Sequence, residues 1–129
     1  MRRTVRLNNG NELQLECNAA SPIIFKRHWN EDLMNGFQNL ESKDPSETIT
    51  FMEKAVYTFS KTAEFGVKAA LNIEVDINGI EFIEFLSQFD FLEIASGEVL
   101  NTVMEMWGIN IRSEAELKNL QSPQQENPQ

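Results

Sequence analysis

The sequence contains very few of the side chains on which enzymes and metal sites depend. Among 129 residues there is one cysteine, Cys17, and one histidine, His28. No metal-binding, phosphate-binding or nucleophile motif is present. We therefore expect no enzyme activity, no catalytic residue, no metal site and no cofactor. We expect Cys17 to be buried and inert in a strand, and His28 to be an ordinary surface or half-buried residue off the apolar face of its helix.

Long apolar runs are also missing. No stretch approaches the roughly 18 apolar residues that cross a membrane, and Met1-Arg2-Arg3 leads into polar residues, unlike a signal peptide. Bases are scarce, since 11 Lys and Arg face 20 Asp and Glu for a net charge of −9. This balance argues against a nucleic acid or an anionic membrane as a partner. A single cysteine suits the reducing cytoplasm.

The charge is unevenly distributed along the chain. Residues 1–27 contain five bases and two acids, whereas residues 70–111 contain eight acids and no base. This pattern is compatible with a solvated acidic face beside a basic N-terminal part. The alternatives are head-to-tail attraction between subunits, or an acidic surface for a basic partner.

The first part of the chain predicts a β-hairpin over residues 4–17. Residues 4–7 and 13–17 both alternate apolar and polar side chains, which is the period of a half-buried strand. Between them, residues 8–11 read Asn-Asn-Gly-Asn, and these residue types tolerate the positive φ that a tight turn requires. An isolated hairpin is marginally stable, so we expect it to pack on helices.

Two helices are predicted in the middle of the chain. The first spans residues 22–40, capped by Ser21, with an apolar stripe at spacings of three and four: Phe25, Trp29, Leu33, Phe37 and Leu40. The second begins at the capping box of Asp44 and Glu47 with Pro45 between them, and runs to residue 61 or on to residue 71. Its buried stripe is predicted to contain Met52, Ala55, Val56, Phe59 and Ala63, flanked by Phe51 and Tyr57.

The rest of the chain is predicted to be mostly helical. Residues 72–78 form a brief strand or an ordered loop, a third helix spans residues 80–89, and a fourth runs from residue 91 or 96 to residue 107. Residues 113–120 form a weak turn, and the polar residues 121–129 form a disordered tail. Together these elements predict a mainly α fold: a compact bundle of about four helices with an N-terminal β-hairpin, in one domain over residues 1–120.

Residues 80–107 hold an excess of apolar side chains, with 16 such positions among 28. One buried stripe of a helix requires only three to four per two turns. Either this region forms a central helix surrounded by the others, or one of its faces is a docking surface. For the second interpretation the candidate partner-facing residues are Phe82, Phe85, Phe89 and Trp107.

Two short motifs follow the hairpin, Phe25-Lys26-Arg27 and Trp29-Asn30-Glu31-Asp32-Leu33. An aromatic-basic start followed by aromatic-x-x-Asp-Leu, behind a short β element and before amphipathic helices, resembles the small tail assembly chaperones of long-tailed phages and prophages of Gram-positive hosts. Asn30 departs from the pattern, which has a glycine at this position.

The resemblance implies a non-enzymatic chaperone made in the host cytoplasm and absent from the mature virion. Proteins of this family help the long, helical tape measure protein to become coated by tail tube subunits. The implied partners are therefore the tape measure protein, the tail tube protein and further copies of the chain. Two alternatives remain: a small acidic helical adaptor or regulator that mimics nucleic acid or sequesters a basic factor, and a structural subunit of the tail.

Overall fold

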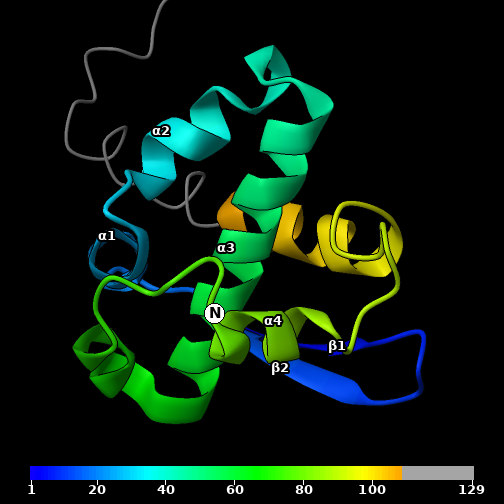
Figure 1. Cartoon of the computed structure of the whole chain (residues 1–129), viewed down its shortest axis with the longest axis horizontal. Coiled ribbons are helices and arrows are strands. Elements are labelled where there is room, and N and C mark those ends of the chain that lie inside the picture. Colours follow the sequence, from blue (N-terminus) through cyan, green and yellow to red (C-terminus); the bar gives the residue numbers. More distant parts are fainter. Residues whose placement is uncertain (109–129) are drawn as a thin grey trace, which may run out of the picture.

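The computed structural model describes residues 1–108 and has a β-hairpin followed by helices (Figure 1). The prediction of a mainly α fold with an N-terminal hairpin is confirmed. The elements, in chain order, are β1 (Arg2–Arg6), β2 (Glu12–Glu16), α1 (Ser21–Trp29), α2 (Leu33–Gln38), the 3₁₀ helix η1 (Leu40–Ser42), α3 (Pro45–Phe65), the 3₁₀ helix η2 (Gly66–Leu71), α4 (Ile80–Leu86) and a helix over residues 97–108.

The hairpin is antiparallel and packs its apolar side against α3. Val5 pairs with Leu13 across the strands, and Val5 and Leu15 are fully buried. Gly10 adopts a φ of +92° in the turn, the left-handed region that favours glycine. Cys17 is buried, as the sequence predicted. The alternation of apolar and polar residues therefore placed the strands correctly to within two residues.

The predicted single helix over residues 22–40 is wrong, because the chain breaks into α1 and α2. Asn30 adopts a left-handed conformation with a φ of +55° and ends α1. The carboxylate of Asp32 then accepts a hydrogen bond of 2.9 Å from the backbone N–H of Asn35 and caps α2. Ser21 is also not the cap of α1: Ala20 holds that position, and the Ser21 hydroxyl accepts from the backbone N–H of Asn18.

Helix α3 is the central element, and in Figure 1 it runs through the middle of the molecule. Asp44 and Glu47 form the predicted capping box at its start. The predicted stripe is buried apart from Ala63, which is half-buried, and the two residues expected at its flanks, Phe51 and Tyr57, are buried as well. The helix is wrapped on more than one side, by β2, α1, α4 and η2.

Residues 72–79 form an ordered loop rather than a strand. Its backbone N–H groups at Glu74 and Val75 donate to the carbonyls of Arg27 and His28, at 2.8 and 2.7 Å. These two carbonyls lie in the last turn of α1, where no helical N–H is available to them. The loop therefore completes the C-terminal end of α1. Helix α4 follows it and is shorter than the predicted 80–89.

The helix over residues 97–108 closes the core against the hairpin. Val99, Val103 and Met106 are buried among the core side chains. In the loop before this helix, the carboxylate of Glu93 accepts from the backbone N–H of Asn8 in the hairpin turn, at 2.7 Å. The first and last parts of the described chain therefore lie together. Of its two predicted starts, residue 91 is wrong, since residues 91–96 form turns and a bend, and residue 96 agrees with the structure to within one residue.

Three predictions fall on residues that the structure does not describe: the turn at 113–120, the end of the domain at 120 and the tail over 121–129. Within residues 1–108, none of the helices combines the length and the apolar content required of a membrane-spanning segment.

Candidate interaction surface

The four aromatic residues predicted to face a partner do not form an exposed face. Phe82, Phe85 and Trp107 are 1%, 9% and 8% exposed and belong to the hydrophobic core. Trp107 stacks on Phe37 with ring centroids 4.5 Å apart. Phe89 is half-buried and packs on Phe85. The prediction of partner-facing aromatics is therefore wrong for the three buried rings, because their surfaces are already used inside the domain.

The aromatic side of α4 is turned inward by a cluster of rings on α1 and α3. Phe82 lies 5.0 Å from Trp29 and 5.4 Å from Tyr57, measured between ring centroids, and Phe85 lies 5.2 Å from Tyr57. These are edge-to-face contacts, which stabilise aromatic pairs beyond the burial of their area. The outward face of α4 is apolar as well, but it carries Ile80 and Ile83 rather than phenylalanine.

Exposed apolar side chains are concentrated between residues 65 and 83, which we call the 65–83 segment. It holds seven of the twelve large apolar residues that are exposed within residues 1–108: Phe65, Val67, Leu71, Ile73, Ile77, Ile80 and Ile83. Single exposed apolar residues are normal, whereas seven within one short stretch of the chain make this segment the candidate for an interaction surface.

The segment begins where α3 stops. Gly66 adopts a φ of +63° and ends the helix, and the chain continues as the tight turns of η2. Ala69 is the buried residue of η2, whereas Val67 and Leu71 project outward, with Leu71 76% exposed. A short 3₁₀ helix cannot bury an apolar stripe as a longer α-helix does. The apolar residues of η2 are therefore left at the surface.

A hollow of about 400 Å³ opens beside η2, and we call it the η2 hollow; it is lined by Lys61, Phe65, Lys68, Ala69, Leu71, Asn72 and Glu81. The ammonium of Lys61 lies over the rings of Tyr57 and Phe65, at 5.4 and 5.9 Å from their centroids. Burial, followed by the negative charge of Glu81, raises the pKa of Tyr57 to about 12. The η2 hollow thus has apolar walls, and both basic and acidic side chains, Lys61, Lys68 and Glu81, lie around it.

A buried polar network holds η2 in place beside this hollow. The ring of His28 lies between the hydroxyl of Thr58, 2.9 Å from Nδ1, and the carbonyl of Ala69, 2.7 Å from Nε2. A carbonyl only accepts, so Nε2 carries the proton and Nδ1 accepts from the Thr58 hydroxyl. Trp29 Nε1 donates to the same hydroxyl oxygen at 3.1 Å. The network ties α1, α3 and η2 together.

The sequence-based view of His28 as a surface or half-buried residue is wrong, since it is fully buried. Burial is the main cause that lowers its pKa from the usual value of 6.5, with the Ala69 carbonyl opposing this effect. The ring is accordingly neutral, and its role is to position η2. Within residues 1–108, no group of three or more His, Cys, Asp or Glu side chains is arranged to hold a metal ion.

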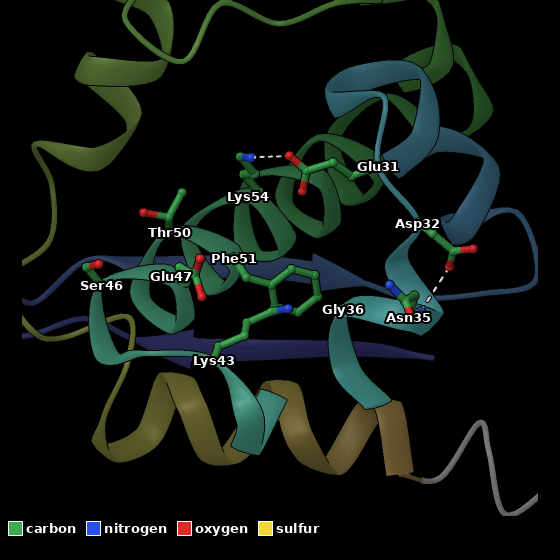
Figure 2. Close-up of a pocket in the computed structure, with 10 residues that line it drawn as sticks. All are labelled: Glu31, Asp32, Asn35, Gly36, Lys43, Ser46, Glu47, Thr50, Phe51 and Lys54. Atoms are coloured by element: carbon green, nitrogen blue, oxygen red, sulfur yellow. Dashed lines mark hydrogen bonds and ion pairs between the residues drawn. The ribbon is translucent and has the colours of Figure 1, made fainter. Parts of the chain in front are cut away.

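A larger pocket of about 460 Å³ lies between α2 and the start of α3 (Figure 2). Four of its charged side chains, Glu31, Asp32, Glu47 and Lys54, make contacts within the fold. Lys54 points at Glu31 and forms an ion pair with it. Asp32 caps α2, and Glu47 belongs to the capping box of α3. These side chains stabilise helix ends and join the α1–α2 turn to α3, so this pocket is a weaker candidate for binding than the 65–83 segment.

The candidate interaction surface in the structure is therefore the 65–83 segment with the η2 hollow, and not the four aromatic residues predicted from the sequence. The sequence contained one signal for this surface, the apolar residues that follow Gly66 without a helical period. Comparison with known proteins finds no family model, no curated protein and no solved structure that matches the chain.

Proposed function

We propose that the protein is a non-enzymatic tail assembly chaperone that binds the phage tape measure protein and promotes assembly of the tail tube around it. The 65–83 segment is the observation that carries this proposal. A tape measure protein is a long helical client, and an amphipathic helix binds by laying its apolar side chains into a hydrophobic groove. The η2 hollow and the exposed isoleucines supply such a surface.

The backbone at Asn30 supports the resemblance to this family. The family pattern has a glycine here, and Asn30 adopts a φ of +55°, a conformation that glycine and asparagine reach at the least steric cost. Asn30 therefore differs from the family pattern in residue type, but its backbone has a conformation that a glycine would also adopt. The partners in this proposal are the tape measure protein, the tail tube protein and copies of the chain, in the host cytoplasm and not in the finished virion.

The use of the acidic side chains supports a chaperone over an acidic mimic. A mimic needs its acids displayed on one open face. Here Asp90 and Glu93 bond to the hairpin turn, and Glu105 pairs with Arg3 at 3.6 Å. These three acids of residues 70–111 are thus bonded to the hairpin, while large apolar side chains are left exposed.

The proposal is tested by co-expressing the full chain with fragments of a tape measure protein. We expect at least one fragment to become soluble and to co-purify with the wild-type chain. Leu71→Asp places a charge beside the η2 hollow and should abolish this effect. Met34→Asp is the matched control, because Met34 is also exposed but lies on α2. Circular dichroism checks that both variants remain folded.

Two results would contradict the proposal. One is that no fragment is retained by the wild-type chain. The other is equal retention by Leu71→Asp and Met34→Asp, which would remove the η2 hollow from the interaction. Mass spectrometry of purified tails distinguishes a chaperone from a structural subunit. A structural subunit is detected in the finished particle, whereas a chaperone is not.

A further inference from the structure

We propose that residues 109–120 of this chain bind back into an apolar hollow between α1 and the start of α2. None of the residues that line this hollow belongs to the 65–83 segment, and the contact can be tested on the chain alone. The proposal therefore stands or falls independently of the client named above. It rests on the lining of the hollow, on the place where the described chain ends, and on the composition of the residues that follow.

The hollow has a volume of about 400 Å³ and we call it the α1 hollow; its lining residues are Pro22, Ile23, Lys26, Arg27, Asp32 and Leu33. Ile23 is 61% exposed, and it is the one large apolar side chain that α1 leaves at the surface. Pro22 and Leu33 extend the apolar wall, and Lys26 and Arg27 form a basic rim. The hollow therefore suits an apolar segment that carries acidic side chains.

The described chain ends close to this hollow. Trp107, next to the last described residue, stacks on Phe37 of α2 with ring centroids 4.5 Å apart and ring planes inclined by 17°. Leu33, which lines the hollow, lies one helical turn before Phe37, about 6 Å along the axis of α2. In Figure 1 the last helix ends on the side of α3 where α1 and α2 lie. One ring contact and one turn of helix thus separate the end of the described chain from the α1 hollow.

Residues 109–120 lie outside the described part of the chain and carry the last large apolar side chains of the sequence: Ile109, Ile111, Leu117 and Leu120. Leu117 and Leu120 are three positions apart, the spacing of one helix face, and Ser113 with Glu116 has the spacing of a capping box before them. Residues 121–129 contain no apolar side chain other than proline. The composition therefore selects residues 109–120 as the part that gains from an apolar contact.

The connection to the hollow is long enough. The eight residues 109–116 span up to about 28 Å when extended, which exceeds the helical turn and ring contact that have to be crossed. Because the segment is attached to the domain, its effective concentration at the hollow is on the order of millimolar. A hollow of this size can thus hold a tethered segment where a free partner would dissociate. The two leucines and Ile23 then leave water together, and Glu114, one turn before Leu117, meets the basic rim.

This contact would make the exposed side of α1 a regulated surface. A partner that binds Ile23, Lys26 or Arg27 would first have to displace residues 109–120. Its apparent affinity would be reduced in proportion to the fraction of chains in which the hollow is free. Release of the segment would therefore switch α1 from a closed to an available surface.

NMR on the full chain with a spin label at Ser122→Cys tests the proposal. The label lies two residues beyond the proposed contact, and mass spectrometry confirms that the buried Cys17 stays unlabelled. We expect the label to broaden the amide signals of residues 22–33 most strongly. The amides of the hairpin turn over residues 8–11, on the opposite side of the molecule in Figure 1, should be affected least.

Two variants of the labelled chain test the contact from its two sides. Ile23→Asp places a charge in the α1 hollow, and Leu117→Asp places one in the segment, so each should remove the broadening of residues 22–33. Leu92→Asp is the matched control, because Leu92 is 51% exposed and does not line the hollow. It should leave the broadening unchanged. Circular dichroism shows whether each variant is folded.

Mixing spin-labelled chains with isotope-labelled chains that carry no spin label separates docking within one chain from docking between chains. Broadening of residues 22–33 in this mixture would assign the segment to a neighbouring copy and overturn the proposal. Broadening that is uniform along the chain, or strongest over residues 65–83, would also overturn it. The same holds if the broadening persists in folded Ile23→Asp or Leu117→Asp chains.

Discussion

His28 makes the stability of the folded protein depend on pH. It is buried as the neutral ring, and burial lowers its pKa below 6.5. Between the lowered pKa of the folded state and 6.5, the unfolded chain binds more protons than the folded one. Stability from this group is therefore complete above pH 6.5 and is lost as the pH falls below it. Each pH unit removes up to about 1.4 kcal/mol until the folded-state pKa is reached.

The single histidine allows a direct measurement of this effect. We expect the His28 signal in an NMR titration of the untagged folded protein to report a pKa below 6.5. Denaturant unfolding at pH 7.5 and pH 5.5 should show lower stability at the acidic pH, and His28→Gln should reduce that difference. A titration midpoint at or above 6.5 would show that burial does not control the charge of this ring.

Gly36 is required in α2 because a neighbouring ring fills the space of its side chain. A Cβ at this position would lie 2.1 Å from Cε1 of Phe51. That ring cannot move easily, since it is buried and packs edge-on against Phe37 at 5.0 Å. Gly36→Ala should therefore destabilise the protein by about 1–3 kcal/mol in denaturant unfolding. At an unobstructed helical site, replacing glycine with alanine would instead stabilise the protein by about 1 kcal/mol. A gain in stability would therefore show that the Phe51 ring does not obstruct this position.

The break between α1 and α2 shows what an apolar stripe can and cannot predict. Phe25, Trp29, Leu33 and Phe37 recur at helical spacing and are all buried, as predicted. Their spacing does not reveal where α1 ends, because the position of the break depends on the local preferences of two residues between Trp29 and Leu33. Asn30 reaches the left-handed region at little cost, and an aspartate at position 32 caps a new helix.

Helix α4 provides a test of which face is inside. Phe82→Ala removes a ring packed on Trp29 and Tyr57 and should lower the free energy of unfolding by about 3–5 kcal/mol. Ile83→Ala, the matched change on the exposed face, should stay within about 0.5 kcal/mol of wild type. Thermal and denaturant unfolding measure both. Equal losses would mean that α4 is turned over relative to this structure.

The orientation of α4 could not be read from the sequence because both of its faces are apolar. The phenylalanines are the larger side chains, and they reach the rings of Trp29 and Tyr57 from neighbouring helices. That cluster depends on residues that lie more than twenty positions away in the chain. A pattern within one helix contains no information about it, so the predicted interaction residues fell on the wrong side.

Among the carboxylates that join the hairpin to the last part of the described chain, Glu93 is the buried one. Glu93 is buried and accepts from the backbone N–H groups of Asn8 and Asp90, at 2.7 and 2.9 Å. Glu93→Ala leaves both donors without this acceptor and should cost about 1–3 kcal/mol in denaturant unfolding. Glu93→Gln keeps one carbonyl oxygen and should cost less. A loss of the same size in both variants would show that the charge, and not the hydrogen bonding, holds this contact.

For the molecule as a whole, local patterns predicted the elements and missed the contacts between distant ones. The hairpin, the capping box at Asp44 and the buried stripe of α3 each depend on neighbouring residues, and each was predicted. The burial of His28 and the contact of Glu93 with Asn8 depend on residues thirty to eighty-five positions apart. The exposure of the 65–83 segment also depends on distant residues, because a side chain stays exposed only when no other element packs over it.

The loop over residues 72–79 links the proposed client surface to the far end of α1. Ile73 and Ile77 are exposed on this loop, while the amides of Glu74 and Val75 hold the last carbonyls of α1. A bound client that pulled the loop outward would release those carbonyls, and α1 would fray from its C-terminal turn. The amides of two residues outside any helix or strand should thus exchange slowly with solvent deuterium. Their exchange rates would report whether client binding loosens the helix that carries Lys26 and Arg27.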